Sequence, residues 1–271
     1  MRGIVIIFIA IIVIFVIYVF AFDNELVVRL YKIPTDKVQS GIRIGFIADL
    51  HNSEYGENQK DLMDRLTELH PDIVLLGGDI IDENSSIKNT AAFIASVAKA
   101  YPCFYVSGNN EVSSGQIQAI KRICADTGVV FLEGDCYNID INGQDINICG
   151  IDDCLIGERE FNYQLETTMI DCDTNLYTVL LSHRPEHIDK YLNFEYDLIL
   201  SGHTHGGIWR LPFIINGLYA QNQGLFPKYA GGIYEFDKAV LIVSRGLEKD
   251  TNYFPIIFNP PELVIVDIVS E

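Results

Sequence analysis

Two histidines that follow an apolar stretch have the residue type and spacing of a possible metal site. Residues 196–201 lead into Gly202-His203-Thr204-His205, and two more glycines follow. Side chains two positions apart at a strand end leave on the same side, so His203 and His205 could converge on one metal ion. Histidines in loops are also often solvent-exposed or hydrogen-bonded, so the pair alone leaves both interpretations open.

Polar residues follow four more apolar segments in the same way. The strands expected at residues 42–48, 73–76, 103–106 and 178–181 are followed, in order, by Asp49 and His51, Asp79, Asn109, and His183. A single aspartate after a strand is usually a turn former or a helix cap. Five such strand ends together favour one shared site, because ligands bind at the carboxyl ends of strands in open α/β sheets.

Helical segments separate these strands and must position the residues that follow them. We expect one helix that begins near Asn58, another over residues 90–100, and a hairpin at Asn142-Gly143. Residues 152–173 are polar, and we expect a loop or small lid there. The alternation of strands and helices predicts an α/β fold built on a parallel sheet.

The composition limits the partners of the protein. The 271 residues carry a formal net charge of −18, and the 19 lysines and arginines form no basic cluster. Because such a surface repels polyanions, we expect no nucleic acid partner, and a bound phosphate would need a local cation. The six cysteines lack zinc-ribbon spacing and are expected mainly in the core, with Cys149 and Cys154 as the pair to test for a disulfide.

The N-terminal segment predicts a membrane anchor. Residues 4–22 contain no charged residue, and about 20 apolar residues cross a bilayer as a helix. A cleaved signal peptide is the alternative, although its apolar core is usually only about 7–15 residues long. We expect a single-pass anchor in the cell membrane over residues 1–22, a juxtamembrane connection over 23–41 that could contain one strand around residues 26–30, and one domain over 42–271. Basic residues on both flanks leave the orientation open, with a preference for an extracytoplasmic domain.

Five ordered blocks of the sequence resemble the calcineurin-like metallophosphoesterase superfamily. They are Asp49-Leu50-His51, Gly78-Asp79, Gly108-Asn109-Asn110-Glu111, His183 and Gly202-His203-Thr204-His205. The strings His203-Thr204-His205-Gly206-Gly207 and Asn259-Pro260-Pro261-Glu262 resemble its bacterial membrane-associated phosphodiesterase branch. The resemblance implies a four-layer αββα sandwich, preceded in this chain by one transmembrane helix.

The resemblance also implies two divalent metal ions. One ion would be held by Asp49, His51, Asp79 and His205, and the second by Asp79, Asn109, His183 and His203. Asp79 would thus bridge the two. Mixed carboxylate and imidazole ligands suit Mn, Fe or Zn. Such ions, about 3.5–4 Å apart, would lower the pKa of a bridging water towards about 7 and stabilise an in-line attack on phosphorus.

One block departs from the family pattern. Asn110 stands where the superfamily usually has a histidine that contacts phosphate and protonates the leaving group. An amide donates a hydrogen bond but supplies no proton, and general acid help is typically worth about 10²- to 10⁴-fold. We expect Asn110 and Asp79 at the catalytic centre, and substrates whose leaving groups are stable as anions.

These features predict a membrane-anchored, dinuclear metal-dependent phosphoesterase that hydrolyses a phosphodiester or pyrophosphate bond. The expected partners are the bilayer and a phosphate-ester small molecule or lipid, such as UDP-2,3-diacylglucosamine. The alternative is a catalytically impaired metal-binding membrane protein in which Asn110 marks the lost chemistry. Arg245 is a candidate phosphate contact, and four aromatic residues could form a lipid-facing or substrate-facing wall: Trp209, Phe213, Tyr219 and Phe226.

Overall fold

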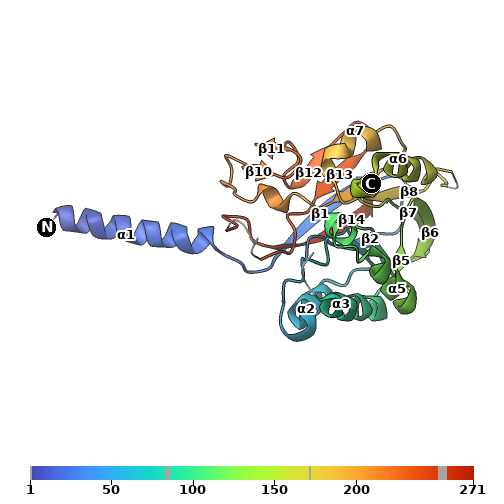
Figure 1. The fold of residues 1–271 in the computed structure, drawn as a ribbon. Coiled ribbons are helices and arrows are strands. Elements are labelled where there is room, and N and C mark those ends of the chain that lie inside the picture. Colours follow the sequence, from blue (N-terminus) through green and yellow to red (C-terminus); the bar gives the residue numbers. More distant parts are fainter. Residues whose placement is uncertain (1, 83–85, 171, 250–254) are drawn as a thin grey trace.

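Two six-stranded sheets form the centre of the protein (Figure 1). The computed structural model describes residues 2–82, 86–170, 172–249 and 255–271. The first sheet consists, in spatial order, of β1 (Val27–Thr35), β14 (Glu262–Ser270), β2 (Ile42–Ile47), β3 (Ile73–Leu76), β4 (Cys103–Tyr105) and β5 (Val130–Phe131). The second consists of β12 (Gly232–Glu235), β13 (Val240–Val243), β9 (Leu198–Ser201), β8 (Tyr177–Leu181), β7 (Gln144–Gly150) and β6 (Asp135–Ile141).

Each sheet contains a block of parallel strands, as the sequence predicts. β2, β3, β4 and β5 run parallel in the first sheet, and β7, β8, β9 and β13 run parallel in the second. The hairpin at Asn142-Gly143 is also confirmed, because β6 and β7 pair antiparallel with Ile141 opposite Gln144. Since parallel strands end at a common edge, each sheet brings the residues after its strands together.

The two sheets pack face to face around the largest core cluster. Phe46 and Leu75 of the first sheet and Val179 and Leu200 of the second belong to this buried cluster. The outer face of the first sheet is covered by α2 (Lys60–Leu69), α3 (Ile87–Ala100) and α5 (Ile117–Thr127). The outer face of the second is covered by α6 (Glu158–Thr167) and α7 (Ile188–Tyr191) (Figure 1). The layers are therefore helix, sheet, sheet and helix.

Two local predictions need correction. The helix expected from Asn58 begins at Lys60, because a 3-10 turn, η1 (Glu57–Gln59), precedes it and Asn58 has a left-handed backbone. The loop or lid expected over residues 152–173 is wrong, since this region contains η2 (Cys154–Ile156) and α6. Phe161 and Leu165, four positions apart, are buried on α6, which explains why a mostly polar segment is helical.

The N-terminal helix leads directly into the first sheet. α1 (Arg2–Ala21) is long and apolar enough to cross a membrane, judged by length and composition. Residues 23–41, expected as a juxtamembrane connection, contribute β1, which pairs in parallel with β14 along its whole length. The backbone N–H of Phe258 donates to the carbonyl oxygen of Ala21 at 2.7 Å, which ties the end of α1 to the segment before β14.

The cysteines form no disulfide, and Cys103, Cys124 and Cys149 are buried as expected for core residues. All six are free, and the Sγ atom of Cys149 lies 2.7 Å from that of Cys136, directly opposite on the β6–β7 hairpin. Cys172 lies close to both. A Cys149–Cys154 disulfide is therefore wrong for this structure.

The packing of α2 predicts a large effect of truncating Leu66. This side chain is fully buried, and a Cβ added to Gly45 would lie 3.1 Å from its Cδ1 atom, so little space exists around it. We expect Leu66→Ala to lower the free energy of unfolding by about 2–5 kcal/mol, measured by urea denaturation in detergent micelles. Leu30→Ala makes the same chemical change at a 61 % exposed position and should change it by less than about 0.5 kcal/mol. Equal effects would contradict the packing described here.

Candidate metal centre

All seven predicted metal ligands, together with Asn110, lie at the carboxyl ends of parallel strands from both sheets. Asp49 and His51 follow β2, Asp79 follows β3, Asn109 and Asn110 begin α4 (Asn109–Ser113), His183 follows β8, and His203 and His205 follow β9. His205 begins the 3-10 turn η4 (His205–Gly207). The two sheets thus contribute to one cluster, as the repeated strand endings predict.

The backbone around the cluster is tight and strained. Asp49, His51, Asp79, His203 and His205 all have positive φ angles between 46° and 71°, a region that residues other than glycine rarely adopt. The N–H of His203 donates to both carboxylate oxygens of Asp49, at 3.0 and 2.9 Å. The glycines in the motifs allow this close approach.

Steric contacts explain two of those glycines. A Cβ at Gly108 would lie 2.2 Å from Oδ1 of Asp79, and one at Gly202 would lie 2.4 Å from Oδ2 of Asp49. Only glycine leaves room for a carboxylate against the backbone of the neighbouring loop. The Gly-Asn and Gly-His pairs of the sequence are therefore packing requirements of the cluster.

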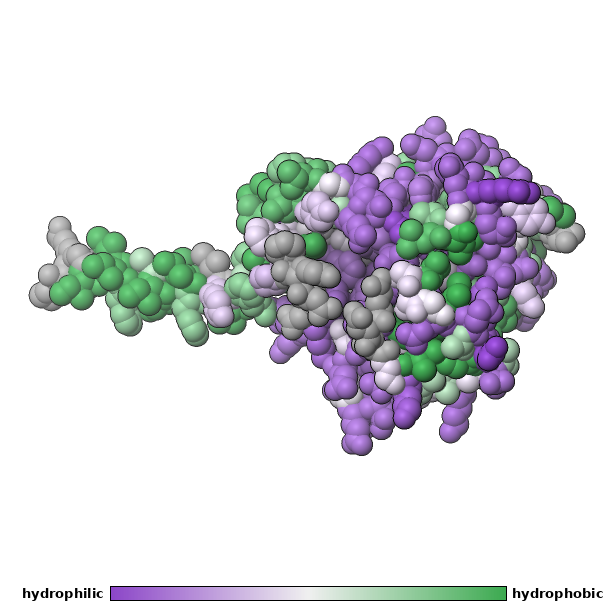
Figure 2. Space-filling view, in the orientation of Figure 1, coloured by the Kyte–Doolittle hydropathy of each residue, from purple (hydrophilic) through white to green (hydrophobic). Residues whose placement is uncertain are grey.

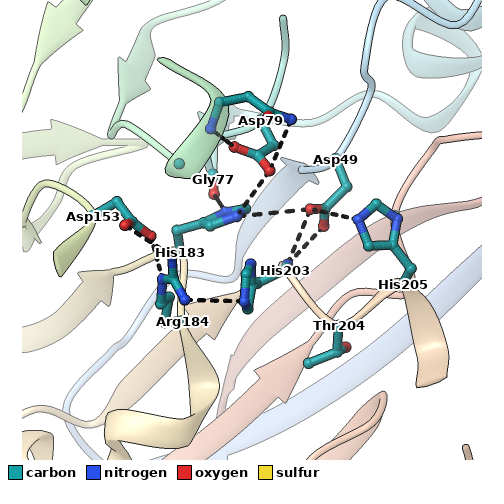
Figure 3. Close-up of polar contacts among 12 residues, drawn as sticks. Asp49, Gly77, Asp79, Asp153, His183, Arg184, His203, Thr204 and His205 are labelled. Carbon is teal, nitrogen blue, oxygen red and sulfur yellow. Dashed lines mark hydrogen bonds and ion pairs between the residues drawn. The ribbon is translucent and has the colours of Figure 1, made fainter. Parts of the chain in front are cut away.

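The polar side chains form two adjoining groups (Figure 3). Within each group, the possible ligand atoms all lie within 4.8 Å of one another; the groups are Asp49, His51 and His205, and Asp79, His183 and His203. The imidazole of His183 lies between the groups, with Nε2 at 3.4 Å from Oδ2 of Asp79 and 3.8 Å from Oδ1 of Asp49. The Nε2 atom of His51 lies 3.7 Å from the same Asp79 oxygen.

Several possible ligand atoms in the cluster lack a hydrogen-bond partner. The Nε2 atoms of His51 and His183 and the Oδ1 atom of Asn109 are buried without a hydrogen bond. The Nδ1 atom of His183 lies 2.8 Å from the carbonyl oxygen of Gly77, which fixes the ring so that Nε2 is directed at the carboxylates. Buried polar atoms are normally satisfied, so these atoms fit a group that binds nitrogen and oxygen ligands, such as a divalent cation.

The electrostatics of the cluster also favour a cation. Burial by itself would lower the pKa of His183, but the carboxylates of Asp79 and Asp49 raise it to about 10. His205 shows the same balance, with Asp49 and Glu248 raising its pKa to about 9. Burial also raises the pKa of the Asp49 carboxyl. The buried carboxylates thus draw protons onto neighbouring histidines, and a metal ion would supply that positive charge instead.

His203 is the exception among these histidines. Burial lowers its pKa well below the usual value, and the neighbouring His183 and Arg184 contribute in the same direction. Its Nε2 atom lies 3.2 Å from Nη1 of Arg184 and 2.9 Å from Oδ1 of Asn222. The imidazole is therefore held neutral, which is the state that ligates metals.

Sequence analysis missed a layer of supporting residues behind the cluster. Arg184 is buried and donates from Nε and Nη2 to the carboxylate of Asp153 at 2.5 and 3.1 Å. Glu248 lies 3.1 Å from Nδ1 of His205. Among these residues, only Arg184 is next to a predicted ligand, His183, in the sequence. Asp153, Asn222 and Glu248 come from three separate loops, and their place near the cluster cannot be inferred from the sequence.

The start of α4 holds the loop that carries Asp79. The Glu111 carboxylate accepts hydrogen bonds from the backbone N–H groups of Asp79, Ile80 and Gly108 at 2.7–2.9 Å and from the Tyr105 hydroxyl at 2.7 Å. The side-chain amide nitrogen of Asn110, Nδ2, lies 2.8 Å from Nδ1 of His51 and 3.3 Å from Oδ2 of Asp79. Asn110 therefore contacts two candidate ligands directly.

Arg245 has a structural role in this loop region. Its guanidinium is buried and donates to the carbonyl oxygens of Gly206, Asn216 and Gly231 and to the side chain of Asn259. These contacts use the donors that a phosphate would need, so the structure does not support the expected phosphate contact. Arg245 instead fixes the loop that follows η4.

Comparisons with known proteins agree with this geometry. Residues 42–207 match the family model of calcineurin-like phosphoesterases. An uncharacterised metallophosphoesterase of Aquifex aeolicus (strain VF5) is 31 % identical over 251 residues, which cover 89 % of this chain and 91 % of the relative. The phosphodiesterase YaeI of Escherichia coli (strain K12) is 26 % identical over 212 residues, or 76 % of this chain and 74 % of YaeI.

A solved structure shows the same fold. The phosphopantetheinyl hydrolase PptH of Mycobacterium tuberculosis aligns with a TM-score of 0.51 and 12 % identity over 86 % of this chain and 97 % of PptH. The matched region of the family model includes every candidate ligand from Asp49 to His205. The chain therefore belongs to the calcineurin-like phosphoesterases, and it is a metal-dependent hydrolase of phosphoester bonds.

Proposed function

We propose that the protein is a membrane-anchored phosphodiesterase that uses two divalent metal ions, Mn, Fe or Zn, in the centre described above. The observation that carries this proposal is the set of unpartnered buried atoms on His51, His183 and Asn109 around two buried carboxylates. A folded protein rarely leaves such atoms unsatisfied without a ligand. The relation to YaeI supports a phosphodiester as substrate, and a pyrophosphate remains within the same proposal.

The geometry supports a division of the ligands into two sets. One ion would be held by Asp49, His51 and His205, and the other by Asp79, His183 and His203. Asn109, whose buried Oδ1 atom has no hydrogen bond, would join the second set. Asp79 would bridge the two ions, because its Oδ2 atom is within 3.7 Å of Nε2 of both His51 and His183. Ions bound in this way supply a Lewis acid for the phosphoryl oxygens and lower the pKa of a water.

The contacts of Asn110 support catalysis rather than a decayed site. Its side chain lies between His51 and Asp79 and displaces neither. A tethered amide positions these ligands and offers a hydrogen-bond donor, but it cannot protonate a leaving group. The enzyme would thus cleave esters whose leaving groups are stable anions, and the reading as a catalytically impaired protein is the weaker one.

The membrane location is part of the proposal. α1 has the length and composition of a span, and it enters the folded domain without a long linker. We propose a single-pass anchor in the cell membrane, with the domain on the extracytoplasmic side. An amphiphilic phosphoester, such as UDP-2,3-diacylglucosamine, would then be available in the adjoining bilayer.

Removal of metal, or of one metal ligand, should abolish turnover. We expect the full chain in detergent micelles to hydrolyse bis-p-nitrophenyl phosphate with added Mn²⁺, and chelator to stop the reaction. His183→Ala should lower turnover by about 100-fold or more, because the metal contributes several kcal/mol to the barrier. Mn²⁺ should also raise the Tm of the wild type more than that of His183→Ala, which keeps the ligand set of Asp49, His51 and His205.

The matched control for this experiment is His70→Ala. His70 is exposed after α2 and lies outside the cluster, so this variant should keep both turnover and the Mn²⁺-dependent rise in Tm. Chelator-resistant hydrolysis, or full activity of His183→Ala, would refute the proposed metal centre.

Replacing Asn110 by histidine should extend the range of substrates. We expect Asn110→His to raise turnover of an alkyl phosphodiester by about tenfold or more, because an imidazole can protonate a poor leaving group. Turnover of bis-p-nitrophenyl phosphate should change little, since p-nitrophenolate leaves without a proton. Asn110→Gln adds bulk without a proton and should show no gain; a gain there would remove the general acid explanation.

Glu111 should act on metal affinity through the loop that it holds. Glu111→Gln removes one carboxylate oxygen that accepts N–H bonds around Asp79, so we expect the Mn²⁺ concentration for half-maximal activity to rise about 10- to 100-fold. Activity at saturating Mn²⁺ should largely return, which separates positioning from chemistry. Glu68→Gln, an exposed change on α2, should leave the metal titration unchanged.

A further inference from the structure

The segment at residues 208–226 exposes an unusual amount of apolar surface. In the described part of the chain, fourteen large hydrophobic side chains outside α1 are exposed, and seven of them belong to this segment: Trp209, Leu211, Phe213, Ile214, Tyr219, Leu225 and Phe226. Arg210 is the only charged residue of the segment. A contiguous apolar surface on a folded protein marks a contact with a partner or a membrane.

A pocket lies within the same segment. Its volume is about 410 Å³, and it is lined by Gly207, Ile208, Trp209, Leu218, Tyr219 and Leu225. The lining contains no charged residue, so the pocket suits an apolar group. Because Gly207 is only two positions after His205, the pocket begins directly beside the candidate metal centre.

The far end of the segment also returns to that centre. β10 (Tyr219–Ala220) and β11 (Gly224–Leu225) form a small hairpin, and Asn222 lies in its turn. The Oδ1 atom of Asn222 lies 2.9 Å from Nε2 of His203 and accepts from Nη1 of Arg184 at 2.7 Å. The apolar segment is thus attached to the candidate centre at both ends.

Backbone contacts also hold the segment beside the end of α1. Trp209 pairs in parallel with Ile257, and the next residue, Phe258, donates to the carbonyl oxygen of Ala21. Figure 2 shows that the hydrophobic surface of α1 and that of the β10–β11 region lie at the same end of the molecule. A bilayer crossed by α1 would therefore begin beside residues 208–226.

Three bulky residues of the segment have a left-handed backbone. Ile208, Phe213 and Phe226 have φ angles of 56°, 67° and 56°, although bulky side chains rarely adopt this region. Phe213 is fully exposed, and Phe226 is 64 % exposed. Strain of this kind persists mainly at functional sites.

We propose that residues 208–226 form a second membrane contact, in which the exposed side chains enter the bilayer and the pocket takes one hydrocarbon chain of a bilayer lipid. The inference rests on the proposed membrane anchoring and deepens the proposed function. A lipid fits better than a protein partner, because the segment adjoins a candidate span and Arg210 is its only charged residue. A lipid held this way would have its head group near His205, so the substrate class is an amphiphilic phosphoester.

The single tryptophan of the chain allows a direct test. Trp209 is the only tryptophan, and its indole N–H donates to the carbonyl oxygen of Pro255 at 2.8 Å, which fixes the ring at the pocket wall. We would reconstitute the full chain into phosphatidylcholine vesicles and compare lipids with brominated and unbrominated acyl chains. Bromine quenching of Trp209 fluorescence, with protection from aqueous iodide, is expected. Iodide quenching without bromine quenching would overturn the proposal, even with α1 in the bilayer.

Variants distinguish the effect of residues 208–226 from that of exposed apolar side chains elsewhere on the protein. The double substitution Phe213→Ser and Ile214→Ser should reduce bromine quenching, whereas Ile170→Ser should leave it unchanged. Ile214 and Ile170 are 75 % and 72 % exposed. Ile170 comes shortly after α6, and α6 lies at the end of the molecule away from α1 (Figure 1). Far-UV circular dichroism checks folding of each variant. Equal quenching in all three proteins would refute a membrane role for the segment's apolar side chains.

The ionic strength dependence gives an independent check. The chain carries a net charge of −18, so electrostatic forces do not draw it to a bilayer. The proposed contact therefore depends on apolar side chains. Quenching should persist at high salt. The fluorescence measurement does not depend on turnover, and hydrolysis of bis-p-nitrophenyl phosphate does not depend on a bilayer. If only the lipid contact is wrong, quenching fails and hydrolysis remains; if only the catalysis is wrong, hydrolysis fails and quenching remains.

Discussion

The burial of the Asp49 and Asp79 carboxylates is the constraint on which the rest of the site depends. Both side chains are almost fully buried at the junction of the two sheets. An unpaired buried charge is costly, so each must be compensated by backbone N–H groups, histidines or cations. The His203 N–H bonds to Asp49 and the Asn110 N–H bond to Asp79 supply part of this compensation. The remaining demand for positive charge suits the cluster to bind a divalent cation.

The same constraint explains why the sequence is informative here. A carboxylate that packs against a neighbouring loop requires glycine in that loop, and the glycine, the strand before it and the polar residue after it are all visible in the sequence. The parallel strands and the gathering of Asp49, Asp79, Asn109, His183 and His203 could therefore be predicted. Arg184, Asn222 and Glu248 could not, because their contacts exist only after loops far apart in the sequence fold together.

Other parts of the fold escaped prediction for local reasons. α6 lies in a polar segment, and only Phe161 and Leu165 indicate its buried side. For β1 the sequence predicts only a connection that could contain a strand around residues 26–30, whereas the strand extends to Thr35 because it pairs with β14, more than 200 residues away. In both cases tertiary contacts decide the structure, and the local pattern carries little information about them.

Asn222 and Arg184 couple the apolar segment to the chemistry. Arg184 is fixed by Asp153 on one side and contacts both His203 and Asn222 on the other. The β10–β11 hairpin therefore adjoins the candidate ligand His203 through Asn222. If a bilayer holds the hairpin in place, as proposed, it also holds the contacts of Asn222 and Arg184 with this imidazole. The membrane would then help to position the candidate metal centre, because the segment proposed to contact lipid also supports one of its ligands.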